Sequence, residues 1–372
     1  MSAKLRFPCD ERVRRQLERA LDTGQLAGAY LFEGAPGAGQ EQVALELAAW
    51  IIAGSTDPAD AAASRVLRFT HPDLLLVQAL VPGKAASEMK EDDWLDLFRQ
   101  YQGRRVEDPL VLPEFRTNPR ISIFGMRGVR QELGTRPFEG RGRAVILRDA
   151  EVMEKEAQDA LLKTLEEPPS NTLLVLISYR PESLNPTILS RCQRLPFEPL
   201  DRETVAGILC ERGLEPARAE FLAGLADGDL EEAVRLAAAE GEEGNVLLER
   251  REAWFDLLDR CELGSEADMI DAVREVATRK KGDSKNPTAL RAAFLAQMMS
   301  WYRDLLRTPP GEPLRVHGDQ ERRRERYAGL EPWQLAERLQ RCEKARGQIL
   351  GYVNAPLTLA SFFLSVRGRK AS

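Results

Sequence analysis

Histidine is scarce in this sequence, and cysteine never occurs in closely spaced pairs. The 372 residues contain two histidines, His71 and His317, which are too few and too far apart for a histidine-based metal centre. The five cysteines are odd in number, widely spaced and without a C-x-x-C pair. This usage argues against a disulfide framework and against a structural zinc site. We therefore expect no bound metal and mostly buried, reduced thiols.

Long apolar runs and an excess of positive charge are also missing. No run approaches the roughly 20 residues that cross a bilayer, and the first residues lack the apolar region of a signal peptide. These absences predict a cytoplasmic location. The net charge is −6, whereas a protein that wraps nucleic acid is usually basic. Any contact with nucleic acid should therefore be local.

The chain is 43% hydrophobic and 30% charged, which is typical of a globular protein of two or three domains. Its first 200 residues alternate short apolar runs with helical patterns, such as those at 41–53 and 154–167. Continuous runs of Leu, Val and Ile indicate strands that are buried on both faces of a parallel sheet. This alternation predicts a doubly wound α/β domain. The predicted strands are 29–34, 73–80, 143–149, 172–179 and 193–199.

A glycine-rich segment, EGAPGAGQEQ at 33–42, follows the first predicted strand and precedes a helix. Gly34, Gly37 and Gly39 stand where a phosphate-binding loop would have them, but Gln40 and Glu41 replace the Lys and Ser or Thr of that motif. Gln40 carries no charge, and Glu41 places an anion where a magnesium ligand belongs. At about 4 Å and an effective dielectric near 20, one charge pair is worth about 4 kcal/mol. The segment therefore predicts a vestigial loop.

The second element of a nucleotide site is altered as well. After the strand AVIL come Arg148, Asp149, Ala150 and Glu151, where an active ATPase needs an acidic pair. Arg148 puts a cation where magnesium would need an anion, and only the vestigial Asp149 could still face the site. Two motifs that change in compatible ways predict the loss of nucleotide chemistry.

A longer segment carries a specific resemblance. DALLKTLEEPPSNTLLVLISYRPESLNPTILSRCQRLPFEPL, at 159–200, resembles the clamp-loader branch of the AAA+ superfamily, and THPDLLLV, SIFGMRGVRQEL and NAPLTLASFFLSVR follow the expected order more loosely. The altered ATP motifs are more similar to those of the delta-prime subunits of bacterial DNA polymerase III than to those of the hydrolysing gamma/tau subunits. The resemblance implies a RecA-like AAA+ domain, a small helical lid and an all-α collar, at 1–199, 200–243 and 244–372.

In the family that this segment resembles, the Arg of Ser-Arg-Cys is an arginine finger for the ATP of a neighbouring subunit. That residue is Arg191 here, and Ser190 and Cys192 flank it. Arg is permanently charged and offers phosphate a planar fork of donors. Without the context of this motif, an ion pair within its own chain is the favoured interpretation of Arg191.

The sequence departs from the family pattern in three places. Residues 53–69 contain no Cys, whereas many relatives have a zinc module there. Glu231 occupies the position at which the lid of active relatives presents an Arg toward ATP. The segment 82–118 has no counterpart. We expect it to be an insertion with a short amphipathic helix that packs on the domain or binds a partner.

Two basic features of the sequence each allow more than one interpretation. Lys163, in LLKTLEE, could contact DNA or a subunit interface, or it could face solvent. The run ERRRERY at 321–327 could touch nucleic acid, or it could form a solvated helix face or loop.

The resemblance implies a stator that hydrolyses no ATP and needs no cofactor of its own. It would supply Arg191 to a gamma/tau ATPase and act with a delta subunit, the sliding clamp and primer–template DNA. The first alternative is an active gamma/tau-like ATPase. The second is a non-replicative AAA+ scaffold, although a scaffold would not need an intact Ser-Arg-Cys.

Overall fold

The computed structural model describes residues 4–79, 105–106, 110, 120–167, 169–239, 246–277, 287–350 and 354–366. The chain divides into two compact units, formed by 1–200 with 229–231 and by 201–228 with 232–372. The predicted insertion at 82–118, with its helix, lies outside the described residues except at 105–106 and 110. The predicted boundaries at 199 and 243 stay predictions.

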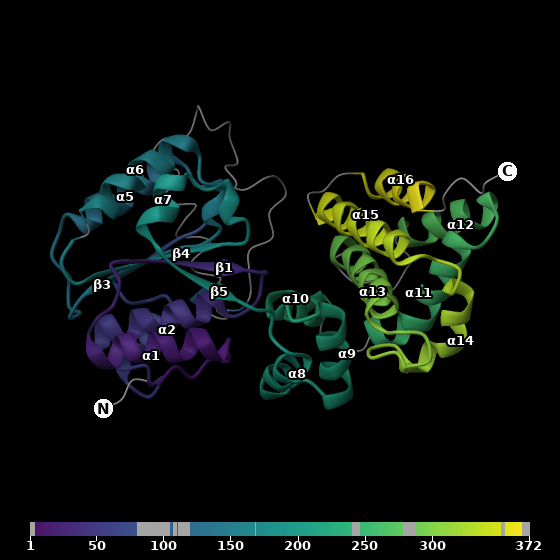
Figure 1. Ribbon diagram of the computed structural model, residues 1–372, viewed down its shortest axis with the longest axis horizontal. Coiled ribbons are helices and arrows are strands. Elements are labelled where there is room, and N and C mark those ends of the chain that lie inside the picture. The colour runs from purple at the N-terminus through teal and green to yellow at the C-terminus, as the bar shows by residue number, and fades with distance from the viewer. Residues whose placement is uncertain are drawn as a thin grey trace. The chain divides into compact units, whose positions relative to one another are not determined.

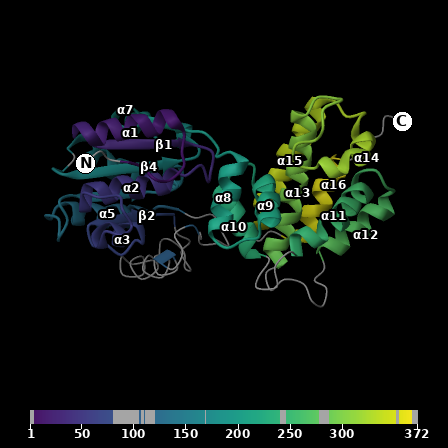
Figure 2. The same cartoon turned by 90° about the horizontal axis from the view of Figure 1, so that it is seen from below.

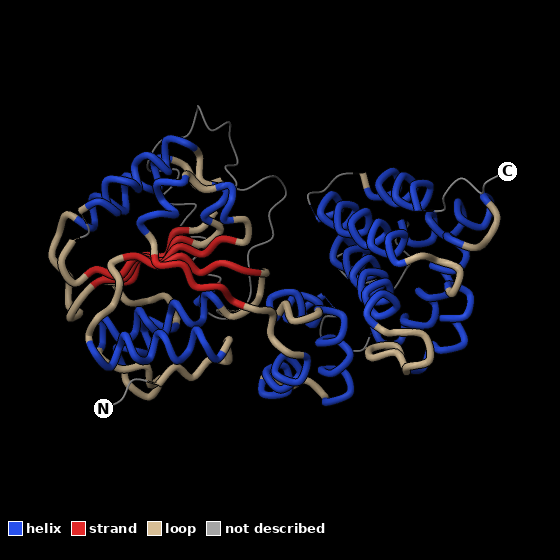
Figure 3. The backbone as a smooth tube through the Cα atoms, viewed as in Figure 1, coloured by secondary structure: helices blue, strands red, loops and turns tan. Residues whose placement is uncertain are grey.

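A parallel sheet forms the centre of the first unit (Figures 1 and 3). Its five described strands lie in the order β2-β3-β4-β1-β5, and each neighbouring pair is parallel. The central strand β4 is buried at six of its seven positions, as the run TLLVLIS predicts for a strand covered on both faces. The strands are β1 (Ala29–Gly34), β2 (Leu74–Val77), β3 (Arg143–Leu147), β4 (Thr172–Ser178) and β5 (Gln193–Phe197).

Helices cover both faces of this sheet, as Figure 1 shows. Side chains alternate along β1, so that Tyr30 and Phe32 pack in one apolar cluster with the first three helices, whereas Ala29 and Leu31 pack in a second cluster with the next three. The first set is α1 (Glu11–Thr23), α2 (Gln40–Ala53) and α3 (Ala61–Leu67), and the second is α5 (Ile123–Leu133), α6 (Lys155–Glu166) and α7 (Pro186–Arg191).

The described secondary structure of the second unit consists of helices, joined by loops. Figure 2 shows α13 and α15 running side by side. Its core contains Trp301, whose ring meets those of Phe255, His317 and Tyr327 edge-on at centroid distances of 5.2, 5.7 and 5.6 Å. The helices are α8 (Arg202–Glu211), α9 (Pro216–Ala226), α10 (Leu230–Ala239, whose first two residues belong to the first unit), α11 (Val246–Glu262), α12 (Glu266–Ala277), α13 (Pro287–Arg307), α14 (Glu321–Arg324), α15 (Pro332–Leu350) and α16 (Ala355–Val366).

The predicted fold class is confirmed: a doubly wound parallel α/β domain is followed by helical structure. The strand predicted at 29–34 is correct to the residue, and the other four end one to three residues earlier than predicted. Among the described residues, no helix combines the length and the hydropathy that a membrane span requires.

Candidate functional site: a phosphate loop closed by its own chain

The glycine-rich loop between β1 and α2 keeps the backbone that glycine alone adopts easily. Gly34, Gly37 and Gly39 have φ angles of 143°, 68° and 87°, values that a side chain would disfavour. A Cβ added to Gly34 would also lie 2.1 Å from the carbonyl oxygen of Phe197. The loop therefore retains the tight strand-to-helix turn that brings backbone N–H groups together.

Other segments of the same unit press against this loop. A Cβ on Gly39 would lie 2.7 Å from the ring of Phe7, and one on Gly37 would lie 2.0 Å from the Asp229 carboxylate. The amide of Leu230 donates to the Gly37 carbonyl at 3.1 Å. Residues from the N-terminal segment and from 229–230 therefore pack directly against the loop.

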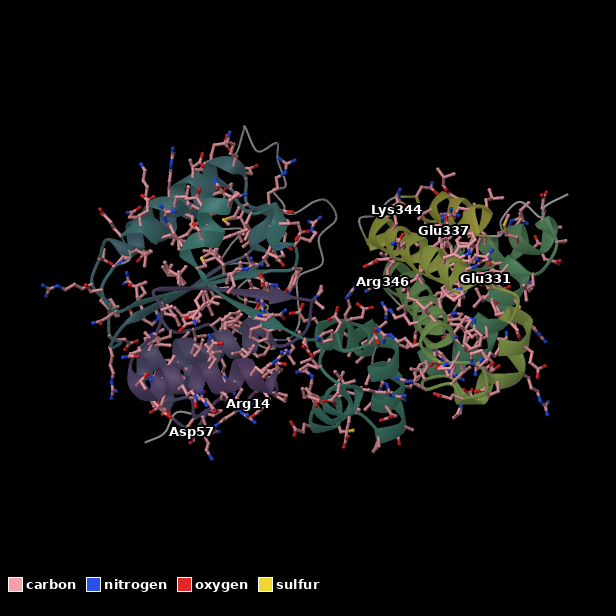
Figure 4. All side chains as sticks on the ribbon, in the orientation of Figure 1. Arg14, Asp57, Glu331, Glu337, Lys344 and Arg346 are labelled. Carbon is pink, nitrogen blue, oxygen red and sulfur yellow. The ribbon has the colours of Figure 1, made fainter. Side chains whose placement is uncertain are left out.

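The N-terminal segment that carries Phe7 is held by hydrogen bonds to Glu46 and Arg14. The Glu46 carboxylate, on α2, accepts from the amide nitrogens of Arg6 and Phe7 at 2.9 and 3.0 Å. Arg14, labelled in Figure 4, donates to the carbonyl oxygens of Leu5 and Phe7 at 2.7 and 3.0 Å. The segment is therefore an ordered part of the fold, and Phe7 packs against the loop at Gly39.

Gln40 has the position of the phosphate-binding Lys, but its side chain points toward the backbone of the loop and bonds to it. Its side chain is 2% exposed, and its Nε2 donates to the carbonyl oxygen of Ala35 at 2.7 Å. The side chain therefore closes the loop internally and supplies no positive charge.

Glu41 has the position of the magnesium ligand and is bound by two arginines. Both residues of each pair are buried. Arg105 contacts the carboxylate with both Nη atoms, one of them at 3.1 Å. Arg148 donates to Glu41 Oε2 at 2.8 Å. The guanidinium of Arg105 also lies over the ring of Phe69, 4.6 Å from its centroid. The anion that would repel phosphate is thus neutralised within the protein.

Arg148 joins Glu41 to a second carboxylate. Its Nη1 and Nη2 atoms lie 2.8 and 2.6 Å from the two carboxylate oxygens of Glu231, in a bidentate pair. Nη2 also donates to the Tyr179 hydroxyl at 2.9 Å, and Nε lies 3.6 Å from the Asp149 carboxylate. Arg105, Glu41, Arg148 and Glu231 therefore form one continuous chain of ion pairs, which we call the buried ion chain.

The pKa values show which of these groups are charged. Burial would raise the pKa of Glu41, but Arg105 and Arg148 outweigh it and hold that pKa below its usual value. Burial raises the pKa of Asp149 to about 6 against the attraction of Arg148. Glu41 is therefore ionised at neutral pH, whereas Asp149 takes up a proton as pH falls through about 6.

The structure brings together most of the residues that the sequence singled out. Glu41, Arg148 and Glu231, which come from three distant segments, contact one another, with Asp149 beside them. The sequence did not identify Arg105, which lies within the predicted insertion, or Tyr179. Buried Glu41 requires a counter-ion, but no pattern in the sequence says which arginine supplies it.

Arg191 lies away from the buried ion chain, at the last position of α7. Its side chain is 34% exposed, and Nη2 lies 2.9 Å from the carboxylate of Glu166 at the end of α6. Ser190 bonds the carbonyl of Thr187 at 3.0 Å. Cys192 is buried, which raises its pKa to about 11. An ion pair within the chain is thus present at Arg191, between two partly exposed side chains.

The THPD segment is structural. The Asp73 carboxylate is fully buried and accepts from the backbone N–H groups of Phe138, Glu139 and Gly140 at 2.6, 3.0 and 2.7 Å. Burial would raise the pKa of Asp73, but these bonds and Arg143 lower it. The carboxylate therefore shapes the turn that leads into β3.

The two basic features have different surroundings. Lys163 is exposed on α6. In the run 321–327, Arg323 and Arg326 contact the Asp259 carboxylate, the first at 2.7 Å. Arg324 donates to the carbonyl oxygens of Thr308 and Pro309. Most of this run is therefore engaged inside the helical unit.

A metal site in the described part of the chain would need several side chains that can ligate metal to lie close together. There, no group of three or more His, Cys, Asp or Glu side chains is placed to hold a metal ion.

Comparison with known proteins gives a family match. A family model described as "DNA polymerase III, delta subunit" matches residues 9–201 of the 372. The DNA polymerase III subunit delta' of Bacillus subtilis (strain 168) is 30% identical over 230 residues, which are 61% of this chain and 58% of that protein. The corresponding subunit of Pseudomonas aeruginosa is 32% identical over 222 residues, or 57% of this chain and 56% of that protein.

Subunits with another name match too. The DNA polymerase III subunit tau of Salmonella typhimurium is 27% identical over 303 residues, which are 78% of this chain and 41% of that protein. The chain thus spans between about two fifths and three fifths of these relatives. Among solved structures, a gamma subunit-related protein from Thermotoga maritima matches 96% of this chain and 99% of its own, with a TM-score of 0.42 and 19% identity.

Proposed function

The chain belongs to the DNA polymerase III delta subunit family, and from this premise we propose that it is a delta-prime-like clamp-loader subunit that hydrolyses no ATP. It presents Arg191 to the ATP of a neighbouring gamma/tau subunit. Together with a delta subunit, it helps to place the sliding clamp on primed DNA. Its relatives include proteins named as the delta' and tau subunits of this polymerase.

The observation that carries the proposal is the buried ion chain in the vestigial phosphate loop. Arg148 bonds Glu41 and Glu231 at 2.8 Å or less. A nucleotide with magnesium would need these charges for itself and would have to break the ion pairs. Leaving one member of such a buried pair without its partner costs about 3–5 kcal/mol. That is a loss of roughly two to three and a half decades in affinity at about 1.4 kcal/mol per decade.

Arg191 has the accessibility that a finger needs. Its charge is permanent, and its side chain lies at the surface beside partly exposed Glu166. An ion pair of this exposure contributes less than about 1 kcal/mol, so a triphosphate can compete for the guanidinium. Arginine fingers accelerate hydrolysis by roughly 10³- to 10⁵-fold.

Equilibrium dialysis of labelled ATP against the isolated chain tests the vestigial site. We expect no saturable binding in the presence of Mg²⁺, with the cognate gamma/tau subunit as the positive control. Micromolar, Mg²⁺-dependent binding that Gln40→Ala abolishes would instead support an active ATPase.

Reconstitution with the cognate gamma/tau and delta subunits, the clamp and primed DNA tests the finger. Arg191→Ala should reduce ATP hydrolysis and clamp loading to near background. The matched control is Arg194→Ala. Arg194 lies three residues after Arg191, is exposed, and pairs with Glu33. Unchanged hydrolysis and loading in the Arg191 variant would sink the finger assignment and favour a scaffold.

A further inference from the structure

We infer that Glu166 is the positioning residue for Arg191: its carboxylate holds the guanidinium in one orientation before the neighbour's triphosphate arrives. This inference rests on the proposed function of Arg191. It concerns a residue of α6, whose own role the finger assignment leaves open.

The backbone at Arg191 is already fixed by its surroundings. Asn185 caps α7 by accepting from the amide of Thr187 at 2.9 Å, and Pro186 occupies the first turn of the helix. Ile188 is fully buried in the apolar cluster beneath α6. Two residues after Arg191, the chain enters β5, where Gln193 pairs with Tyr30 of β1. What remains variable is the long side chain of the arginine.

Two contacts restrict that side chain. Nη2 donates to Glu166 Oε1 at 2.9 Å, and Nη1 donates to the carbonyl of Thr187 at 3.3 Å. A guanidinium has five N–H donors in a rigid fork. These two bonds therefore leave other donors of Arg191 for a second acceptor. Glu166 can keep its bond while the remaining donors contact phosphate, so that the carboxylate orients the fork without consuming it.

Glu166 is an unexpected residue for its place in the helix. It ends α6, where unpaired carbonyl groups and the helix dipole disfavour a negative charge. It is also 51% exposed, and an exposed ion pair adds little to folding stability. An acid that is poorly suited to its helix end and weakly used for stability is best explained by what it does for the cation beside it.

Loss of this contact should leave Arg191 with more rotamers to lose on reaching the phosphate. The variant should therefore hydrolyse ATP more slowly, because ordering the arginine costs more entropy and because hydrolysis requires a precise geometry. The effect should fall on the chemical step, since the neighbour's own loop binds the nucleotide. Because the pair is exposed, it should also weaken as ionic strength rises.

The test is steady-state ATP hydrolysis by the complete reconstituted complex that contains Glu166→Gln. We expect kcat to fall roughly 3- to 10-fold, with KM for ATP nearly unchanged. Glu166→Asp should recover part of the loss, and the difference from wild type should shrink at high salt. The matched control is Glu167→Gln, which removes the next, exposed acid of the same helix end and should leave kcat unchanged. Thermal unfolding of each variant alone should match wild type.

The outcomes separate this inference from the proposal on which it rests. If Arg191→Ala abolishes hydrolysis but Glu166→Gln behaves like wild type, Glu166 has no positioning role and the finger stands. If Arg191→Ala itself has no effect, both assignments are wrong. An equal loss in Glu166→Gln and Glu167→Gln would also overturn the inference, because it would point to the general charge of the helix end.

Discussion

Arg148 is the residue on which the charges around the vestigial loop converge. It bonds Glu41, Glu231 and Tyr179, and it is 4% exposed. Each of these charged residues would be unfavourable in a buried position by itself, since a buried charge without a partner is costly. Together they neutralise one another. The residues that depart from the nucleotide-binding pattern are thus the same residues that pair with one another in the fold.

Arg148→Met should therefore destabilise the protein by about 3–5 kcal/mol, because it removes the cation that the buried Glu41 carboxylate shares with the largely buried Glu231 carboxylate. Urea unfolding monitored by circular dichroism measures the change. Arg194→Met is the control: its ion pair with Glu33 is half exposed on the arginine side, so its loss should cost less than about 1 kcal/mol. Equal costs for the two variants would mean that burial of the ion chain has no energetic importance.

The loop glycines allow a second test at the scale of single residues. Gly37→Ala should cost at least about 1–2 kcal/mol, because φ is 68° and the new Cβ would meet Asp229 and the amide of Leu230. Gly207→Ala is the matched change at an exposed position of helix α8, where a Cβ has nothing within 4 Å. It should stabilise the protein by about 0.5–1 kcal/mol. Opposite shifts in the urea midpoint are expected, and a neutral Gly37→Ala would contradict the packing of the loop.

Among the elements, α2 ties the N-terminal segment to the loop through one buried acid. Burial raises the pKa of Glu46 to about 7, against bonds from the amides of Arg6 and Phe7 and the charge of Arg14. The folded state therefore holds this proton more tightly than the unfolded chain does. The contribution to stability is fully present below pH 4.5 and is lost as pH rises through about 7.

Glu46→Gln removes this titration but keeps an oxygen that can accept the two amide bonds. Relative to wild type, the variant should gain stability as pH rises from about 5 to 8, by on the order of 2–3 kcal/mol at 1.36 kcal/mol per pKa unit. Urea unfolding of both proteins across this range is the measurement. A difference between them that does not vary with pH would mean that Glu46 titrates normally.

The elements also show what could be read from the sequence. Apolar runs such as TLLVLIS predict buried parallel strands, because each residue faces a covered side of the sheet. Strand β4 has the predicted burial. Strand ends were harder to predict: β2 stops at Val77, although an apolar pattern continues. Arg105 was not found because ion pairing between distant segments depends on tertiary placement and leaves no local periodicity. The contact between Phe7 and the loop also depends on tertiary placement and could not be predicted from the sequence.

At the scale of the whole molecule, each of the two units has its own core. The first is built on the sheet and its two apolar clusters. The second is organised around buried aromatic rings and Asp304, whose carboxylate accepts from the backbone N–H groups of Arg315, Val316 and His317 at 2.9 Å each. Substitutions in one core should therefore act first on the unit that contains it.

Differential scanning calorimetry can check this expectation. Two transitions should be resolved, since separate cores form separate cooperative units. Arg148→Met should lower one midpoint, and Asp304→Ala should lower the other. A single transition that both substitutions shift alike would show that the chain unfolds as one unit.

The buried ion chain has a consequence for the order in which mutations can accumulate. Introducing Thr at position 41 alone would leave Arg105 and Arg148 without the carboxylate that they share. Introducing Asp at position 148 alone would set another acid beside Glu41 and Glu231. Each single change should destabilise the protein, which urea unfolding of Glu41→Thr and Arg148→Asp would detect as a large loss. Because these residues depend on one another, epistasis opposes any stepwise path from this loop to the Lys-Thr and acidic pattern of a nucleotide site.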